Sequence, residues 1–446
     1  MNIPLDRLYH YIESLAEKVY GDHVIIYRFW PHGSKNIQDL TPLHKYNQHL
    51  DPWCFIPLHP IIWCHDQEPL NHEFYKTNIF QPDDSELSLA WMTTLHSIGE
   101  SPPAIKNLNH RRTIFEKSLL LHSESRSQDV EKYLNDGEMI PVYYWSHALI
   151  ARDWFRYAQH ENFEGGSEKT FLIYNRAWSG TREYRLKFAD LLIDNLLVHH
   201  CQTNLNPIEP EIDVHYTKHI FKNNNWKPHN TLEDFFKPTN FPASGSADFD
   251  SDDYRRTDIE VVLETLFDDK RLQLTEKILR PIACGQPFIL AGTQGSLEYL
   301  KGYGFKTFDT VWDETYDTMT DSTKRLKAIV QVMRDIAASS PESRSDMLAR
   351  AREIADYNRK WFFSQGFFDL IVGELEQNLF KAFAELKRCD NYLPWMTRWQ
   401  RIINRQEVID FFANMKEMLD NAPSLPNKSR VMLALEIVRA KLVSGS

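Results

Sequence analysis

The chain has 446 residues, of which 42% are hydrophobic and 25% charged, which is ordinary for a soluble globular protein and long enough for two domains. Its formal net charge of -11 argues against a protein whose main task is to grip phosphate backbones. The five cysteines show no paired spacing and no apolar run is long enough to span a membrane, so we expect a reduced, cytoplasmic protein without a membrane span.

The first third of the sequence predicts an α/β arrangement. Apolar residues at helical spacing indicate a helix over residues 5–19, and an amphipathic helix is expected over 148–158. Short apolar runs predict four buried strands, over residues 23–30, 60–64, 118–121 and 142–145. These elements form a predicted N-terminal domain, residues 1–165, and the polar, glycine-containing stretch 159–169 is expected to be a hinge.

Three of these strands are followed by titratable residues. Asp66 and Glu68 follow the second strand, Glu124 follows the third, and His147 follows the fourth. Ligands of open parallel sheets bind at the carboxyl ends of strands, so these four side chains are our candidates for catalytic residues of an active site, in which His147 could act as a general base. Each has an ordinary alternative, because carboxylates after a strand commonly cap the next helix and a single histidine is more often structural.

A second α/β unit is predicted over residues 166–365. Its first strand, residues 170–174, leads through a loop into a helix over 181–197. The loop and the first helical turns contain the polar residues Arg176, Ser179, Gly180, Arg182 and Arg185. Guanidinium groups and a glycine at a helix N-terminus can cradle a diphosphate, and cations there oppose the helix dipole, which indicates an anionic ligand. The alternative is a solvated basic helix start.

The stretch 206–256 is rich in proline, asparagine and aspartate and is expected to form long loops. Near its end four aspartates lie close together, Asp248, Asp250, Asp252 and Asp253. Such carboxylates can hold a divalent metal ion, but an acidic run without a preceding apolar strand is more often a solvated loop. No metal site is therefore predicted.

The stretch 274–308 organises the second unit. Thr275 is expected to cap a short helix that ends at Gly285, and Pro281 should shorten or kink this helix. Further elements are expected on both sides: strands over 259–265, 287–290 and 305–308, and a short helix over 296–301.

Two charged residues, Glu276 and Lys277, open that short helix, and Glu264 lies near the end of the strand before it. The alternation of helix and strand predicts a parallel sheet whose ligand-binding edge carries this carboxylate and this ammonium group.

The rest of the chain is predicted to be mainly helical. Five helices are expected, over residues 325–338, 344–365, 367–387, 406–419 and 429–443. Residues 366–446 would form a C-terminal helical extension that closes over the sheet or bridges the two domains.

The run Thr275-Glu276-Lys277, followed by Gly285-Gln286-Pro287 and an apolar strand, resembles the donor-binding domain of GT-B glycosyltransferases, most closely the fucosyltransferase family. That family has Glu-Asn where this chain has Glu264-Thr265, and its Gly-x-x-Pro is one residue longer than the motif here. The phrases CHDQEPL, LLHSE, YYWSHALIARDWFRYA and YNRAWSGTREYR also resemble those of uncharacterised glycosyltransferases of phages and marine bacteria.

The resemblance implies an α/β fold of two Rossmann-like domains in the GT-B arrangement. It also implies that Glu276 bonds the donor's ribose hydroxyls, that Lys277 and an arginine of the loop 176–182 meet the diphosphate, and that Glu264 and Thr275 lie nearby. The expected reaction is an inverting, metal-independent transfer of a hexosyl or fucosyl group from a nucleotide-diphosphate sugar to a glycan or other hydroxyl acceptor, with no cofactor.

Two alternatives stay open. A phage-type enzyme that glycosylates DNA bases would need a basic channel, for which Arg111, Arg112, Arg152 and Arg156 are candidates, although the net charge disfavours a nucleic acid partner. A non-catalytic nucleotide-binding or structural protein is the other alternative, because a fold does not determine a function.

Overall fold

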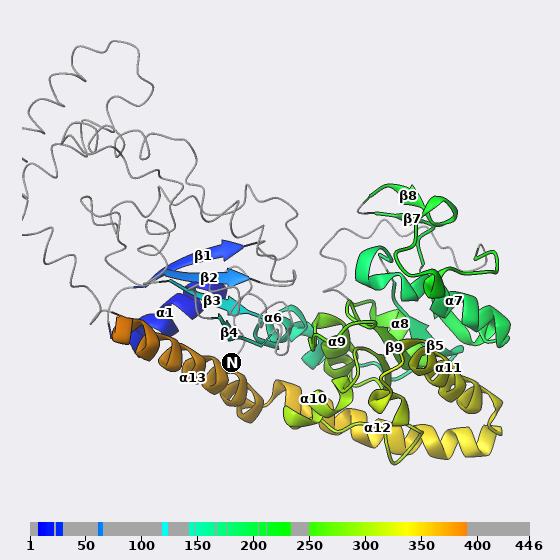
Figure 1. Cartoon of the computed structure of the whole chain (residues 1–446). Helices are drawn as coiled ribbons and strands as arrows, with labels where there is room; N and C mark the ends of the chain where they lie inside the picture. The colour runs from blue at the N-terminus through cyan, green and yellow to red at the C-terminus, as the bar shows by residue number, and fades with distance from the viewer. Residues whose placement is uncertain are drawn as a thin grey trace, which may run out of the picture.

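The computed structural model describes residues 8–21, 24–29, 61–65, 118–123, 142–146, 148–165, 167–175, 177–203, 205–210, 212–232 and 249–389. These residues form a mixed α/β fold that contains two separate parallel sheets of four strands each (Figure 1). No helix in these ranges is long and apolar enough to cross a membrane.

The first sheet contains the four strands predicted in the N-terminal part of the chain. In spatial order they are β1 (Ile25–Phe29), β2 (Ile61–His65), β3 (Ser118–His122) and β4 (Val142–Tyr144). Their apolar side chains form a core, since Ile62, Leu119 and Leu121 are fully buried. Helix α1 (Leu8–Tyr20) packs against β1 through its apolar stripe, as predicted from its spacing.

The second sheet has the strand order β10-β9-β5-β6. Its strands are β5 (Lys169–Ile173), β6 (Cys201–Thr203), β9 (Thr257–Leu263) and β10 (Phe288–Ala291). The chain order reverses between the neighbours β5 and β9, which makes their carboxyl ends a topological switch point, the usual place for a ligand crevice in such sheets.

Helix α9 (Glu276–Cys284) lies between β9 and β10 in the chain and forms as its local sequence predicts. The Oγ1 of Thr275 accepts the backbone N–H of Lys277 at 3.2 Å, which caps the helix. Gly285 ends it with φ of 70°, and a Cβ there would lie 3.0 Å from the Arg359 side chain. The helix is nine residues long and includes Pro281, so the expectation of a short helix is confirmed.

The predicted strand over 305–308 is wrong, although helix α10 (Ser296–Gly302) precedes it as expected. Lys306 finds no neighbouring strand in the described residues. Instead its N–H donates to the Oδ1 of Asn358 at 2.8 Å, and its carbonyl accepts from the Nδ2 of Asn358 at 2.8 Å. A side-chain amide therefore satisfies both groups that a strand would have paired.

The expectation of long loops over 206–256 is wrong in part. The residues form a small antiparallel hairpin of β7 (Ile208–Glu209) and β8 (Val214–His215), and a short helix α8 (Ser251–Arg256). Asp250 caps α8, and the Tyr174 hydroxyl donates to the Oδ2 of Asp253 at 2.6 Å. These aspartates therefore hold the fold together rather than lining a solvated loop, and Asp248 lies outside the described residues.

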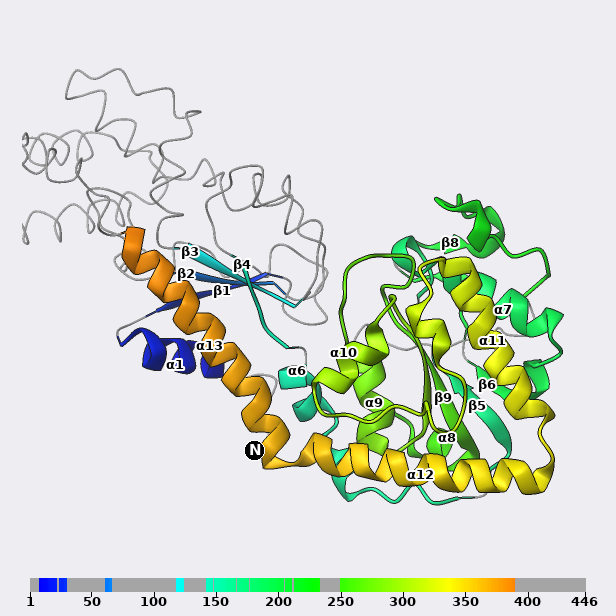
Figure 2. The same ribbon diagram turned by 60° about the horizontal axis from the view of Figure 1, so that its bottom comes forward.

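The helices after residue 321 agree with the prediction in number and place as far as residue 389. They are α11 (Ser322–Ala338), α12 (Pro341–Phe363) and α13 (Gln365–Cys389). The two further predicted helices, 406–419 and 429–443, lie outside the described residues. Helix α12 runs along the part that holds the second sheet, whereas α13 packs against α1 and β4 of the first (Figure 2).

The change of direction between α12 and α13 is held by a buried arginine. Arg152, from α6 (Ala148–Trp154), donates to the carbonyl of Phe363 at 3.1 Å and to that of Ser364 at 2.7 Å. The predicted helix over 148–158 ends earlier, at Trp154, and continues as a 3-10 turn, Arg156–His160. Arg152 thereby connects α6, which precedes the linker, to the residues between α12 and α13, where the chain returns to the first sheet.

The polar linker over 159–169 is attached to the second half of the chain. The Arg359 guanidinium donates to the carbonyl of Glu161 at 2.9 Å, and the Arg255 guanidinium donates to that of Asn162 at 3.0 Å. The N–H of Glu168 donates to the carbonyl of Arg256 at 2.8 Å. The described part of the predicted hinge is thus anchored along its length.

Candidate functional site

The carboxyl end of β3 in the first sheet contacts the segment that precedes α9 in the second part of the fold. Strands β2, β3 and β4 end at one edge, because His65, His122 and Tyr144 are partners in register. In Figure 1 the arrowheads of β1 and β2 point towards the part that holds the second sheet. Ser123, directly after β3, accepts a hydrogen bond of 3.1 Å on its Oγ from the Nε2 of Gln273, just before α9.

The predicted catalytic residues follow these strand ends in the sequence. Asp66 comes directly after β2, Glu124 directly after Ser123, and the others are Glu68 and His147. All four lie outside the described residues, as does the donor-binding candidate Arg176. Their placement therefore stays a prediction.

Four of the predicted donor-binding residues lie together at the N-terminus of α9. The carboxylate of Glu264 accepts from the Oγ1 of Thr275 at 2.7 Å and from its N–H at 3.3 Å. The Nζ of Lys277 lies 2.7 Å from the Oε1 of Glu276. Both carboxylates are about 1% exposed, while 17% of the Lys277 side chain is exposed. The predicted carboxylate and ammonium thus form an ion pair at the sheet edge.

The loop after β5 carries Ser179, Gly180 and Arg182, and the following helix begins as a 3-10 turn, Gly180–Arg182, before α7 (Tyr184–Asp194). The backbone N–H groups of Trp178 and Ser179 donate to one carboxylate oxygen of Glu209, at 2.5 and 2.8 Å. Glu209 comes from the hairpin strand β7 and is fully buried. Two amide groups of the loop expected to cradle a diphosphate are therefore occupied by the chain's own carboxylate.

Arg185, in the first turn of α7, joins this loop to the Glu264 group. Its Nη1 donates to the carbonyl of Ala177 at 2.5 Å, and its Nη2 donates to the carbonyls of Leu263 and Glu264 at 2.6 and 3.1 Å. Burial lowers the pKa of Arg185 from its ordinary value. The sequence shows an arginine near a helix start here, but neither Arg185 nor Glu209 carries a local signal for its partners.

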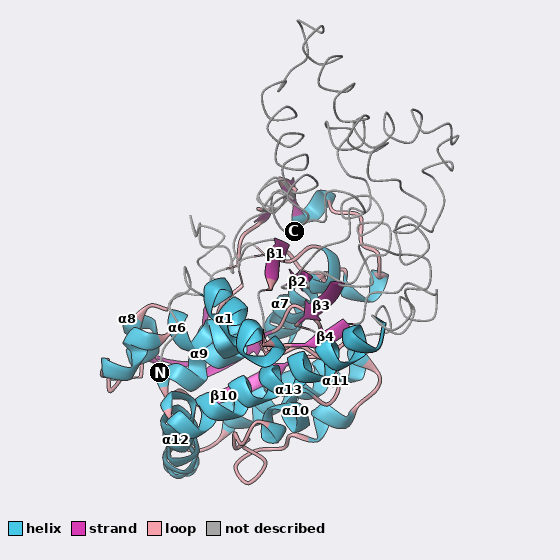
Figure 3. Cartoon of the chain, turned by 90° about the vertical axis from the view of Figure 1, so that its left-hand side faces the viewer, coloured by secondary structure: helices cyan, strands magenta, loops and turns pink. Residues whose placement is uncertain are grey.

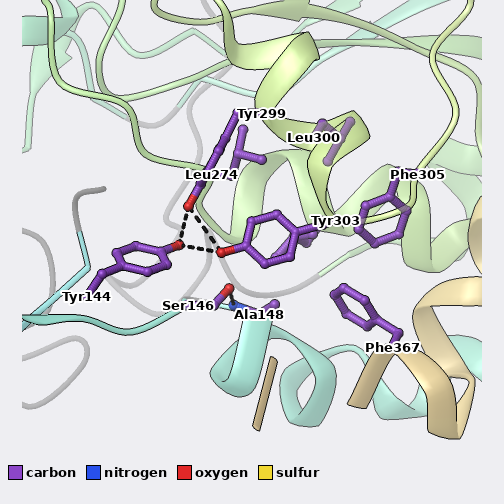
Figure 4. Close-up of a pocket in the computed structure, with 10 residues that line it drawn as sticks. Tyr144, Ser146, Ala148, Leu274, Tyr299, Leu300, Tyr303, Phe305 and Phe367 are labelled. Atoms are coloured by element: carbon purple, nitrogen blue, oxygen red, sulfur yellow. Dashed lines mark hydrogen bonds between the residues drawn. The ribbon is translucent and has the colours of Figure 1, made fainter. Parts of the chain in front are cut away.

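A cluster of tyrosines lies where the two halves of the fold meet (Figure 4). The hydroxyl of Tyr299 donates to that of Tyr144, and the Tyr303 hydroxyl lies 3.2 Å from both. Tyr303, directly after α10, also donates to Glu374 of α13 at 2.8 Å. Figure 3 shows the helices of this part of the fold from the side. The adjoining pocket has free space for roughly one water molecule. Burial raises the pKa of Tyr144 and of Glu374.

One group in the described part of the chain has the spacing of a metal site. Ligand atoms of Asp190, Asp194 and His229 lie within 4.8 Å of one another. However, the Nζ of Lys187 lies 2.5 Å from the Oδ2 of Asp190, so an ammonium group already neutralises the most buried carboxylate of the three.

The chain matches no protein-family model, and comparisons with curated proteins and with solved structures find no significant similarity. What the residues establish is a mixed α/β protein with two parallel sheets, in which the carboxyl end of β3 contacts the segment before α9. An ion pair and a buried arginine lie near the switch point of the second sheet.

Proposed function

We propose that the chain is a glycosyltransferase with two Rossmann-like domains in the GT-B arrangement, which moves a sugar from a nucleotide-diphosphate sugar to a hydroxyl acceptor. The observation that carries this proposal is the hydrogen bond from Gln273 to Ser123, which brings the carboxyl end of β3 to the segment before α9. A crevice between two such edges is suited to hold one substrate on each side.

The donor half of the proposal rests on Glu276 and Lys277. A carboxylate accepts hydrogen bonds from two ribose hydroxyls, and an ammonium group stabilises the charge that builds up on a leaving nucleoside diphosphate. In the structure the two groups bond each other at 2.7 Å. On binding, Glu276 would exchange this partner for the ribose, and Lys277 would turn to the diphosphate with Arg182.

Donor entry requires the crevice to open. Glu276 is about 1% exposed and α9 packs against α6, so the nucleotide cannot reach the carboxylate in the arrangement described here. The hydrogen bonds of the tyrosine cluster around Tyr144 and the bond from Gln273 to Ser123 also connect the two halves of the fold. We therefore expect these contacts to loosen when the donor binds.

The acceptor half rests on the strands of the first sheet. Inversion requires a base that removes the proton of the acceptor hydroxyl on the face opposite the leaving group. The four candidates, Asp66, Glu68, Glu124 and His147, follow the ends of β2, β3 and β4 in the sequence. Positive groups of the donor half would take the place of a metal ion at the leaving diphosphate.

The alternative of a DNA-base glycosyltransferase gains no support from the described residues. Arg152, one of the four arginines expected to form a basic channel, is 2% exposed and bonds backbone carbonyls. Arg156 stacks on Tyr157 at 4.5 Å, and Arg111 and Arg112 lie outside the described residues.

The test is to incubate the purified protein with a panel of nucleotide sugars and to measure release of nucleoside diphosphate together with the thermal shift. A transferase should release diphosphate slowly from its own donor even without acceptor. A protein whose Tm shifts without any release of diphosphate would be the non-catalytic nucleotide-binding alternative, and a protein that does neither would contradict the proposal.

Matched variants test the site itself. Glu276→Gln and Lys277→Met should each weaken donor binding about tenfold or more, because each removes a charged contact. Glu298→Gln is the control, since Glu298 is an exposed carboxylate in the first turn of the neighbouring helix α10. Equal donor affinity in all three variants would contradict the assignment of the donor site.

A further inference from the structure

Arg185 bridges the two segments that flank the switch point of the second sheet. On one side its Nη1 donates to the carbonyl of Ala177 and, at 3.4 Å, to the Oδ1 of Asn175, both in the loop after β5. On the other side its Nη2 donates to the carbonyls of Leu263 and Glu264 at the end of β9. A single guanidinium therefore sets the distance between the two segments.

Arg185 is 3% exposed, yet its acceptors in the described residues are all neutral oxygens. Its Nε has no hydrogen-bond partner among them. Arg280, which is buried to the same degree, pairs with the carboxylate of Glu260 at 2.5 Å. A buried charge without a carboxylate partner is costly, so a nearby anion would be stabilised by it.

Arg185 donates to the backbone carbonyl of Glu264, and the side-chain carboxylate of the same residue already accepts two hydrogen bonds from Thr275. The neighbouring Arg182 adds a second positive charge on the same side and bonds the carbonyl of Ser179 at 3.2 Å. The guanidinium groups of Arg182 and Arg185 thus lie beside the point where the donor's diphosphate is proposed to lie. The two carboxylates there are already hydrogen-bonded, Glu264 to Thr275 and Glu209 to the N–H groups of Trp178 and Ser179.

We infer that Arg185 is a positioning residue for a nucleoside diphosphate: it holds the loop 175–179 at a set distance from the Glu264 group and provides positive charge behind the diphosphate. This inference rests on the proposed function. A lysine would retain the charge but not the bridge, because one ammonium nitrogen cannot reach acceptors on both segments as the planar guanidinium does.

The experiment compares Arg185→Lys and Arg185→Met with the unmodified full-length protein. Binding of inorganic pyrophosphate and of a series of nucleoside diphosphates is measured by titration calorimetry, and folding is followed by thermal unfolding. Arg185→Met should weaken both kinds of ligand about tenfold or more, because it removes charge and bridge together. Arg185→Lys should leave pyrophosphate binding within about threefold but weaken the nucleoside diphosphate about tenfold.

Arg325→Lys and Arg325→Met are the matched controls. Arg325 is 2% exposed and also bonds carbonyls, those of Met319 and Phe267, neither of which belongs to the loop after β5 or to the Glu264 group. These variants should lower the Tm as the Arg185 variants do and leave both affinities unchanged. With a donor that is turned over, Arg185→Lys should raise the donor KM and leave kcat at saturation nearly unchanged.

Several results would overturn the inference. Equal losses of affinity in the Arg185 and Arg325 variants would show that general destabilisation is responsible, and unchanged affinity in Arg185→Met would show that the charge does not act on the ligand. If Arg185→Met does not fold, Arg185→Lys decides the question through its selective loss of nucleoside diphosphate. An unmodified protein that binds neither ligand refutes this inference and the proposed function, whereas one that binds diphosphates but never releases them from sugars refutes only the function.

Discussion

Gln273 and Ser123, which are 150 positions apart in the chain, share a buried hydrogen bond of 3.1 Å between the Nε2 of the first and the Oγ of the second. Ser123 directly follows β3, and Gln273 lies two residues before the cap of α9. The contact therefore joins the carboxyl edge of the first sheet to the N-terminal end of the helix that carries Glu276 and Lys277.

Tyr144 also stabilises this contact between the two halves of the fold, and the loss of its hydroxyl group should lower the stability measurably. Tyr144→Phe deletes the hydroxyl that bonds both Tyr299 and Tyr303, so we expect the free energy of unfolding to fall by about 1 to 2 kcal/mol. Urea denaturation measures the change. Tyr157→Phe is the control, because the Tyr157 side chain is 64% exposed and should cost almost nothing. Equal effects of both variants would contradict the role of the cluster.

The buried pair of Glu260 and Arg280 should be sensitive to loss of one partner. Arg280→Met leaves the Glu260 carboxylate buried beside Tyr254, and we expect a loss of about 3 to 5 kcal/mol in unfolding free energy. Chemical denaturation gives the value. Lys301→Met, which breaks the exposed pair with Asp309, should cost less than about 1 kcal/mol. A small effect at Arg280 would mean that water or another cation compensates Glu260.

Glu314 should make stability depend on pH. Burial raises the pKa of its carboxyl to about 7, from an ordinary value of 4.5. Because the folded state favours the protonated form, the stabilisation is complete below the unfolded pKa and is lost as the pH rises through about 7. We expect Glu314→Gln to remove a decline on the order of 2 kcal/mol between pH 5 and pH 8.

Denaturation of Glu314→Gln and of the unmodified protein at both pH values checks this. An unchanged pH profile in the variant would assign the dependence to other groups. Glu298→Gln, which replaces an exposed carboxylate, controls for the loss of one negative charge.

Glu209 should compete with anions for the loop after β5. Its carboxylate accepts the N–H groups of Trp178 and Ser179, so Glu209→Gln removes a negative charge from the place where a phosphate group would bind. We expect the affinity for pyrophosphate to rise about threefold or more, as titration calorimetry would show. A lower affinity would instead indicate that Glu209 only maintains the loop in its binding conformation.

Elements governed by neighbouring residues were predicted well. The eight strands of the two sheets include seven that short apolar runs indicated, and α9 begins and ends where Thr275 and Gly285 predict. Strand β6 and the hairpin of β7 and β8 were missed, because two or three residues are too few to show a pattern. The error at 305–308 has another cause: an apolar run does not show whether a strand or a side chain such as Asn358 lies beside it.

The amino-acid sequence by itself determined the α/β alternation, the caps of α9 and the ion-pairing residues Glu276 and Lys277 at its start, since each depends on side chains a few positions apart. Only the tertiary structure decided how these pieces meet. Arg185 reaches a carbonyl 78 positions away and Glu209 reaches amides about 30 positions away. Such contacts follow from strand order and packing. Burial also sets how strongly each charged group interacts with its neighbours, so the electrostatic contribution of these groups is fixed only once the whole chain has folded.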